Sequence, residues 1–119
     1  MESLVVFFPC LSLEETRLFY ENILGMEFYM DQGGCYLFDS GYGYLGFSEN
    51  KEMVSKNHPC ISFNLKDEKE VDLKYMELKD QVECTIPQKH PKFPVYSFYL
   101  KDVNGYTLEF QKILMKGKQ

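Results

Sequence analysis

The residues of this chain that could carry chemistry gather in its second half. Glu109 stands in the middle of the alternating run "GYTLEFQKI", where a charged side chain must either face water or take part in binding or catalysis. His58 and Cys60 are two residues apart, which places both on one face of a β-strand. Because a thiol beside an imidazole can pair a nucleophile with its base, Cys60 assisted by His58 is one alternative for this face.

The composition predicts a small globular protein. Its 119 residues are 45% hydrophobic and 16% aromatic, which is enough for the core of one domain. The net charge of −5 speaks against nucleic acid as a partner, because a groove that replaces counterions needs a basic face, and it favours neutral or cationic small molecules. The apolar run Leu4–Phe8 is far shorter than the ~20 residues of a membrane span. We therefore expect a cytoplasmic protein with no membrane contact and no targeting segment.

The four cysteines form no CxxC pair, so a zinc knuckle or a redox pair is not indicated. Reduced, buried thiols are the expectation for a reducing compartment.

The elements that position these residues follow one order twice: strand, helix, strand, strand, strand. Hydrophobic periodicity and turn residues predict a first copy with strands at 4–9, 26–30, 35–39 and 43–49 and a helix over 12–25. A second copy has strands at 60–65, 81–86, 95–100 and 105–113 and a helix over 67–79. The prolines of 87–94 are expected to exclude regular structure there. We divide a single domain, 1–119, into a first module 3–49, a linker 50–57, a second module 58–113 and a tail 114–119.

Two matching helix starts set the register of the repeat. Ser12 precedes Glu15 by three positions, and Asp67 precedes Glu70 by the same spacing. A short polar side chain followed three residues later by Glu is a capping box, which marks the first turn of a helix. The agreement of caps, helix lengths and strand counts indicates an internal duplication.

Alternation along the strands predicts that Glu109 shares a polar face with small and neutral side chains. Leu108 and Phe110 point the other way, under the helix. This polar face could be the solvated side of an antiparallel sheet, but it carries few of the Lys, Arg and Glu residues that such a side usually has. We expect it to line a ligand cavity, with ligand contacts from Cys60, Ser62, Tyr44, Thr107, Gln111 and Phe7.

At this point the chain resembles the vicinal oxygen chelate superfamily, which includes glyoxalase I, extradiol dioxygenases and the fosfomycin- and bleomycin-resistance proteins. The resemblance rests on "SLEETRLFYENILGMEFY", which is similar to the family's first helix and following strand, and on "FYLKDVNGYTLEFQK", which is similar to its closing hairpin. It implies an α+β fold in which two βαβββ modules form an open eight-stranded mixed barrel with the helices outside. It also implies a homodimer.

The resemblance further implies where a metal would bind, because the family takes its ligands from the first and fourth strand of each module. Carried over by the register of the repeat, those positions are Val5, Gly46, Cys60 and Glu109. Two of the four offer no donor atom, so the full metal site is not reproduced. A modified site for one divalent ion (Zn, Ni, Fe or Mn) would use Glu109, His58 and Glu49.

Two functions remain open on this sequence. The first is a small-molecule-binding protein of the resistance type that holds its ligand near Glu109 without the full metal site. The second is a metal-dependent lyase, isomerase or dioxygenase that acts on a substrate with neighbouring oxygens, with Glu109 as a catalytic ligand or proton shuttle. The third interpretation of Glu109 is that it accepts a hydrogen bond from a Ser or Tyr hydroxyl across the sheet and has no functional part.

Overall fold

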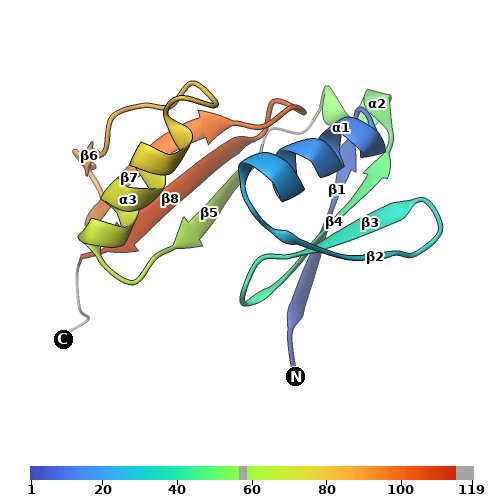
Figure 1. Ribbon diagram of the computed structural model, residues 1–119, viewed down its shortest axis with the longest axis horizontal. Helices are drawn as coiled ribbons and strands as arrows, with labels where there is room; N and C mark the ends of the chain where they lie inside the picture. Colours follow the sequence, from blue (N-terminus) through green and yellow to red (C-terminus); the bar gives the residue numbers. More distant parts are fainter. Residues whose placement is uncertain (57–58, 115–119) are drawn as a thin grey trace. The chain divides into compact units, whose positions relative to one another are not determined.

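The structure is a computed structural model that describes residues 1–56 and 59–114, and it contains two four-stranded mixed sheets (Figure 1). The first half of the chain forms β1 (Leu4–Cys10), α1 (Leu13–Arg17), the π-helix η1 (Leu18–Ile23), β2 (Glu27–Asp31), β3 (Cys35–Asp39), β4 (Gly43–Glu49) and α2 (Lys51–Val54). The second half forms β5 (Cys60–Asn64), α3 (Glu68–Leu78), β6 (Gln88–Lys89), β7 (Val95–Lys101) and β8 (Thr107–Ile113). The predicted α+β class with two βαβββ modules is confirmed.

Each module repeats the same sheet topology. The strand order is β1-β4-β3-β2 in the first sheet and β5-β8-β7-β6 in the second, and the first strand of each module runs parallel to the fourth. The chain divides into two units: the first holds the described residues of 1–58 together with Asp102–Asn104, and the second holds those of 59–101 and 105–119. The prediction that both modules make one domain stays a prediction.

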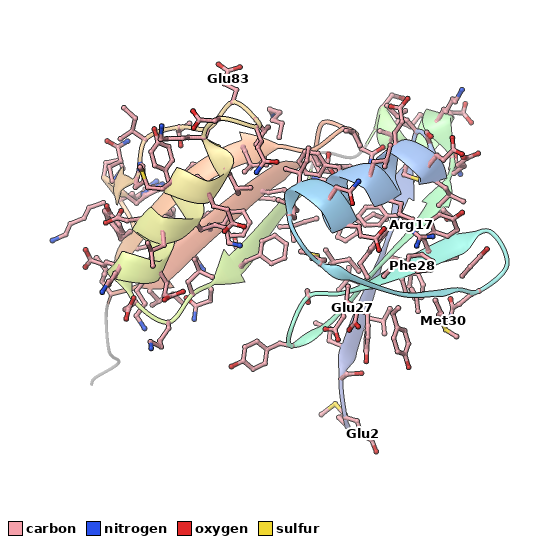
Figure 2. The ribbon with its side chains drawn as sticks, viewed as in Figure 1. Glu2, Arg17, Glu27, Phe28, Met30 and Glu83 are labelled. Carbon is pink, nitrogen blue, oxygen red and sulfur yellow. The ribbon has the colours of Figure 1, made fainter. Side chains whose placement is uncertain are left out.

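In the first unit, the helical segment α1–η1 lies over the sheet and buries an aromatic core. Ser12 begins it as predicted, because its side chain accepts a hydrogen bond from the Glu15 N–H. Tyr20 is fully buried, and its ring centre lies 5.7 Å from that of Phe38 and 4.9 Å from that of Phe47. At the edge of this core the guanidinium of Arg17 lies 3.7 Å from the ring centre of Phe28, a cation–π contact (Figure 2).

The three-residue segment Asp102–Asn104, from the turn between β7 and β8, is packed into this first unit through buried hydrogen bonds. The Tyr20 hydroxyl donates to Asp102 Oδ2 at 2.6 Å. The Asn104 side chain donates to Thr16 Oγ1 at 3.2 Å and accepts from the Leu11 N–H at 2.7 Å. Because these side chains are buried and mutually bonded, the sequence between β7 and β8 is constrained by the first helix.

In the second unit, α3 covers the apolar face of the sheet and packs across β7 and β8 (Figure 1). Asp67 caps its first turn by accepting from the Glu70 N–H at 2.9 Å, which confirms the second capping box. Phe98 of β7 and Phe110 of β8 stack with ring centres 5.4 Å apart, and Tyr75 of α3 meets Phe98 edge-on. The predicted sorting of β8 into an apolar face under the helix and a polar face around Glu109 is confirmed.

Two local predictions were wrong. Segment 81–86 is not a strand: Cys84 forms only an isolated bridge to Leu100. The short strand β6 lies instead at Gln88–Lys89, inside the proline segment. Both of its residues pair with β7, although Pro87 precedes the strand and Pro91 follows it closely. The predicted linker holds the short helix α2. Among the described helices, each falls short of the length and apolar character needed to cross a membrane.

Candidate functional site

Glu109 lies in the middle of the polar face of the second sheet. The parallel register of β5 and β8 pairs it with Ser62, and the antiparallel register of β7 and β8 pairs it with Tyr99. Paired residues of neighbouring strands point to the same face of a sheet. The three side chains therefore form one row across the sheet, with Glu109 in its centre.

The carboxylate of Glu109 is buried and is held by hydroxyl groups. Only 7% of the residue is exposed. The Ser62 Oγ donates to Glu109 Oε1 at 2.5 Å, and Tyr99 is hydrogen-bonded to the same carboxylate from the other side. No ion pair among residues 1–56 and 59–114 includes Glu109. Within this part of the chain, its negative charge is thus solvated by hydroxyl dipoles and not neutralised by a cationic side chain.

The surroundings of Tyr99 raise the pKa of its hydroxyl group. Burial is the main cause that raises its pKa above the usual value of a tyrosine, and the hydrogen bond to Glu109 raises it further, because a phenolate could not donate to the carboxylate. A hydrogen bond with Ser97 acts in the opposite direction. At neutral pH the phenol is therefore a firm donor to Glu109.

An open pocket of about 710 Å³ adjoins this row. Its lining is formed by Val82, Glu83, Cys84, Thr85, Tyr99, Leu100, Lys101 and Thr107. Thr107 precedes Glu109 by two residues on the same face of β8, so the pocket begins beside the carboxylate although Glu109 is not part of its wall. The segment 82–85 is held against β7 because the Tyr99 N–H donates to Thr85 Oγ1 and the Thr85 N–H donates to the Tyr99 carbonyl.

The charged groups of this pocket stand at its margin. Glu83 projects outward from the segment before β6 (Figure 2). Lys101 is exposed, and its ammonium group donates to Thr107 Oγ1 at 3.2 Å. The pocket thus combines the Tyr99 ring and the aliphatic Val82 with threonine hydroxyl groups and two charged side chains of opposite sign. Such a mixture of apolar surface and polar groups can both hold and orient a small molecule.

The structure brings together five of the predicted site residues in the second unit. These are Cys60, Ser62, Thr107, Glu109 and Gln111, which share the polar face of β5 and β8. In the register of β5 and β8, Ser62 pairs with Glu109 and Cys60 pairs with Thr107. The Cys60 Sγ lies 3.8 Å from the Ser62 Oγ. Among these residues only Thr107 lines the large pocket.

The other predicted site residues lie in the first unit or outside the described residues. Tyr44 stacks against Tyr29 with ring centres 4.6 Å apart and borders a separate pocket of about 270 Å³. Glu49 lies on the helix-bearing face of its sheet, where its Oε2 accepts from the Leu13 N–H at 3.0 Å and caps α1. His58 lies outside the described residues.

The first sheet is filled at the place that corresponds to Glu109. Phe7 is paired with Gly46 across β1 and β4, and Leu37 is paired with Gly46 across β3 and β4. A Cβ atom at Gly46 would lie 2.6 Å from Phe7 Cδ1 and 2.8 Å from Leu37 Cδ2. The apolar side chains of β1 and β3 thus occupy the space that a ligand side chain at position 46 would need.

At the four positions that the resemblance implies for a metal, the described residues offer two side chains with donor atoms. Of the positions implied by the resemblance, the first module supplies Val5 and a glycine with no room for a side chain, and the second supplies a thiol and one carboxylate. That carboxylate is already bonded to two hydroxyl groups. Among the described residues, no three His, Cys, Asp or Glu side chains are grouped so that they could hold a metal ion.

Tyr99 and the segment 82–85 were not predicted as site residues. The signal for Tyr99 is present in the sequence, because a five-residue connection at 102–106 pairs Lys101 with Thr107 and hence Tyr99 with Glu109. The position of 82–85 depends on the hydrogen bonds of Thr85 to β7, which no periodicity reveals.

Comparison with known proteins gives structural likeness only. No protein-family model and no curated protein sequence matches the chain. Lactoylglutathione lyase from Agrobacterium tumefaciens is similar with a TM-score of 0.80 at 18% identity, over 97% of this chain and 96% of that chain. An integron cassette protein from the mobile metagenome of the Halifax Harbour sewage outfall is similar with a TM-score of 0.79 at 26% identity, over 92% of this chain and 97% of that chain.

A third structure is that of a ligand-binding protein. The bleomycin-binding protein of Streptomyces verticillus, solved with copper(II)-bleomycin, is similar with a TM-score of 0.70 at 15% identity, over 94% of this chain and 96% of that chain. Many further solved structures of glyoxalase/bleomycin-resistance/dioxygenase proteins match as well. The chain has the fold of the vicinal oxygen chelate superfamily, as its sequence motifs predicted.

Proposed function

We propose that this protein binds a small organic molecule with a cationic, hydrogen-bond-donating group, held beside Glu109 on the polar face of β5, β8 and β7. The observation that carries the proposal is the buried carboxylate: Glu109 has hydroxyl partners, and no cationic side chain among the described residues pairs with it, at the edge of a pocket of about 710 Å³. A buried charge of this kind attracts an opposite charge from a ligand.

The direction of the hydrogen bonds supports this choice of ligand. The hydroxyl of Ser62 donates to Glu109 and Tyr99 is bonded to it as well, so the donors of both groups are used within the protein. The oxygen atoms of both hydroxyl groups can therefore only accept hydrogen bonds from a ligand. Their bonds to the Glu109 carboxylate polarise the hydroxyl groups and make these oxygen atoms stronger acceptors. An ammonium or amidinium group satisfies such acceptors, whereas an anion is repelled.

The pocket supplies the remaining contacts. Val82 and Tyr99 line the pocket and offer apolar and aromatic surface for the body of the ligand. The bleomycin-binding structural neighbour is a precedent for ligand capture on this fold, and fold likeness at 15% identity carries no more than that. In this proposal the ligand is held by shape, stacking and charge, and no metal ion takes part.

A matched-pair thermal-shift screen tests the proposal. Untagged protein in EDTA is heated with 2-phenylethylamine or with 2-phenylethanol, which are close in size but differ in charge at pH 7. Copper(II)-bleomycin is tested as a larger probe in a separate sample without EDTA. We expect the amines of such pairs to raise the melting temperature more than the alcohols, because a ligand that binds only the folded state stabilises it by about 2.7 kcal/mol at a hundredfold excess over its Kd. Equal shifts within every pair would remove the role of charge.

The alternative of a metal-dependent lyase, isomerase or dioxygenase stays a prediction from the resemblance, and no described residue favours it specifically. The expected homodimer and the cytoplasmic location likewise stay predictions. Metal analysis of the untagged protein distinguishes the two functions, because one equivalent of Zn, Ni, Fe or Mn that is needed for stability would support the enzyme.

A further inference from the structure

His90 holds a tight turn through an acceptor bond that protonation would remove. Its Nδ1 accepts from the N–H of Lys92 at 3.0 Å and from the N–H of Phe93 at 3.1 Å. A neutral imidazole has one donor nitrogen and one acceptor nitrogen, whereas the imidazolium has two donors and no acceptor. The observed turn therefore requires His90 with an unprotonated Nδ1.

The same chain contains an oxygen version of this turn. Asp31 Oδ1 accepts from the N–H groups of Gly33 at 2.8 Å and Gly34 at 2.9 Å, which are also two and three residues ahead. Those two N–H bonds are the main causes that hold the pKa of Asp31 below its usual value. The Asp31 turn thus keeps its acceptor through the mildly acidic range in which a histidine ordinarily gains a proton.

The turn at His90 forms part of the wall of a smaller pocket. This pocket of about 100 Å³ is lined by His90, Pro91, Ser97 and Tyr99, among others. Tyr99 and Thr85 line the large pocket as well, so the two spaces share these two residues. A movement of the 90–93 turn would change the wall of the small pocket, which Tyr99 also lines.

We infer that His90 is a pH-sensitive catch that keeps the 90–93 turn closed against the Tyr99 side of the ligand pocket when its imidazole is neutral and releases it when the imidazole is protonated. Phe93 lies against the ring with centres 4.9 Å apart. The charged residues of the same segment are Lys89 and Lys92, and the titratable Tyr99 lines the small pocket together with His90. Neither lysine can stabilise an imidazolium, so protonation meets no compensating carboxylate among these groups. The part that concerns ligand access rests on the proposed function.

Protonation acts in one direction. The two bonds of the closed turn need an unprotonated Nδ1, so a proton bound to this nitrogen removes both of them. The backbone bond from the His90 N–H to the Val95 carbonyl does not involve the imidazole and should persist. Release is therefore expected to be confined to Lys92 and Phe93 and not to unravel β6 and β7.

An NMR titration of the whole chain from pH 8 to pH 5 tests the inference without any ligand. In the wild type, the amide protons of Lys92 and Phe93 should move upfield as the pH falls, in step with the imidazole signals of His90, while those of Gly33 and Gly34 stay fixed. In His90→Asn the side-chain oxygen replaces the acceptor nitrogen but cannot titrate, so the amides of Lys92 and Phe93 should remain downfield throughout. In His90→Ala they should be upfield at every pH. Titration of these amides in His90→Asn, or none in the wild type, would overturn the catch.

The Tyr99 ring signals test the link to the pocket in the same samples. They should shift with the His90 transition in the wild type and stay unchanged in His90→Asn. A turn that titrates while Tyr99 does not respond would overturn the link. Because no ligand is present, neither result bears on whether a cationic molecule binds beside Glu109.

Discussion

Replacement of Gly46 by alanine tests whether the first sheet has room for a ligand side chain. The added Cβ would lie 2.6 Å from Phe7 Cδ1 and 2.8 Å from Leu37 Cδ2, both well inside van der Waals contact. Phe7 is 60% exposed and can swing away, but Leu37 is only 4% exposed and is confined by the core. Overpacking of this kind costs about 1–3 kcal/mol. The lower chain entropy of alanine in the unfolded state offsets this by about 0.4–1 kcal/mol.

The net expectation for Gly46→Ala is a loss of roughly 1–2 kcal/mol in the free energy of unfolding. For a chain of this size that is a fall of roughly 3–10 °C in melting temperature, measured by circular dichroism and by urea titration. Phe7→Ala should reduce the cost of the alanine at 46 by about 0.5 kcal/mol or more in a double-mutant cycle, because it removes one of the two clashes. If Gly46→Ala were as stable as the wild type, position 46 would be open and the exclusion of a ligand side chain there would be refuted.

Three further predictions concern stability. Tyr20→Phe should lower the free energy of unfolding by about 1.5–3 kcal/mol, since it takes a hydroxyl donor from the buried Asp102 carboxylate; urea titration measures this, and an unchanged midpoint would deny that bond its role. Asp67→Ala should cost about 1 kcal/mol through loss of the α3 cap, whereas Asp67→Ser should restore most of it. The hydrogen bond to Asp72 raises the pKa of Tyr96 to about 12, so its stabilisation is complete below pH 10 and is lost between pH 10 and 12; Tyr96→Phe should flatten this part of the pH–stability curve, and an unchanged curve would contradict it.

Local sequence signals were sufficient for the elements and for the central residue of the site. Capping boxes at Ser12 and Asp67 predicted two helix starts that the hydrogen bonds confirm. Alternation around Glu109 predicted its face, because a strand of period two between the apolar Leu108 and Phe110 leaves only one orientation for it. Capping boxes and alternation involve only a few neighbouring residues, so they can be recognised without any knowledge of tertiary packing.

Predictions that depended on long-range contacts were less successful. Segment 81–86 alternates like a strand, but the Thr85 side chain accepts a hydrogen bond from the backbone of β7. Regular pairing with β7 starts only at Gln88. The helix expected over 12–25 is observed as α1 and η1, but its change from an α-helix to a π-helix at Leu18 was not signalled by the sequence. Ser62 was predicted on the same face as Glu109, but that the two residues are direct partners follows from the register of β5 and β8, which alternation along one strand does not reveal.

Calorimetric titration of an amine into three proteins, in EDTA, tests whether the Glu109 carboxylate binds the cationic group. The amine is 2-phenylethylamine or the one that gave the largest shift in the screen. The three proteins are the wild type, Glu109→Gln and Glu83→Gln. Both variants remove one negative charge, but Glu109 is buried beside the pocket and Glu83 is exposed at its margin. The account predicts a roughly tenfold or larger loss of affinity in Glu109→Gln, from a charge pair of about 2–3 kcal/mol at ~6 Å, and less than a twofold loss in Glu83→Gln. Equal affinities in Glu109→Gln and the wild type would contradict it.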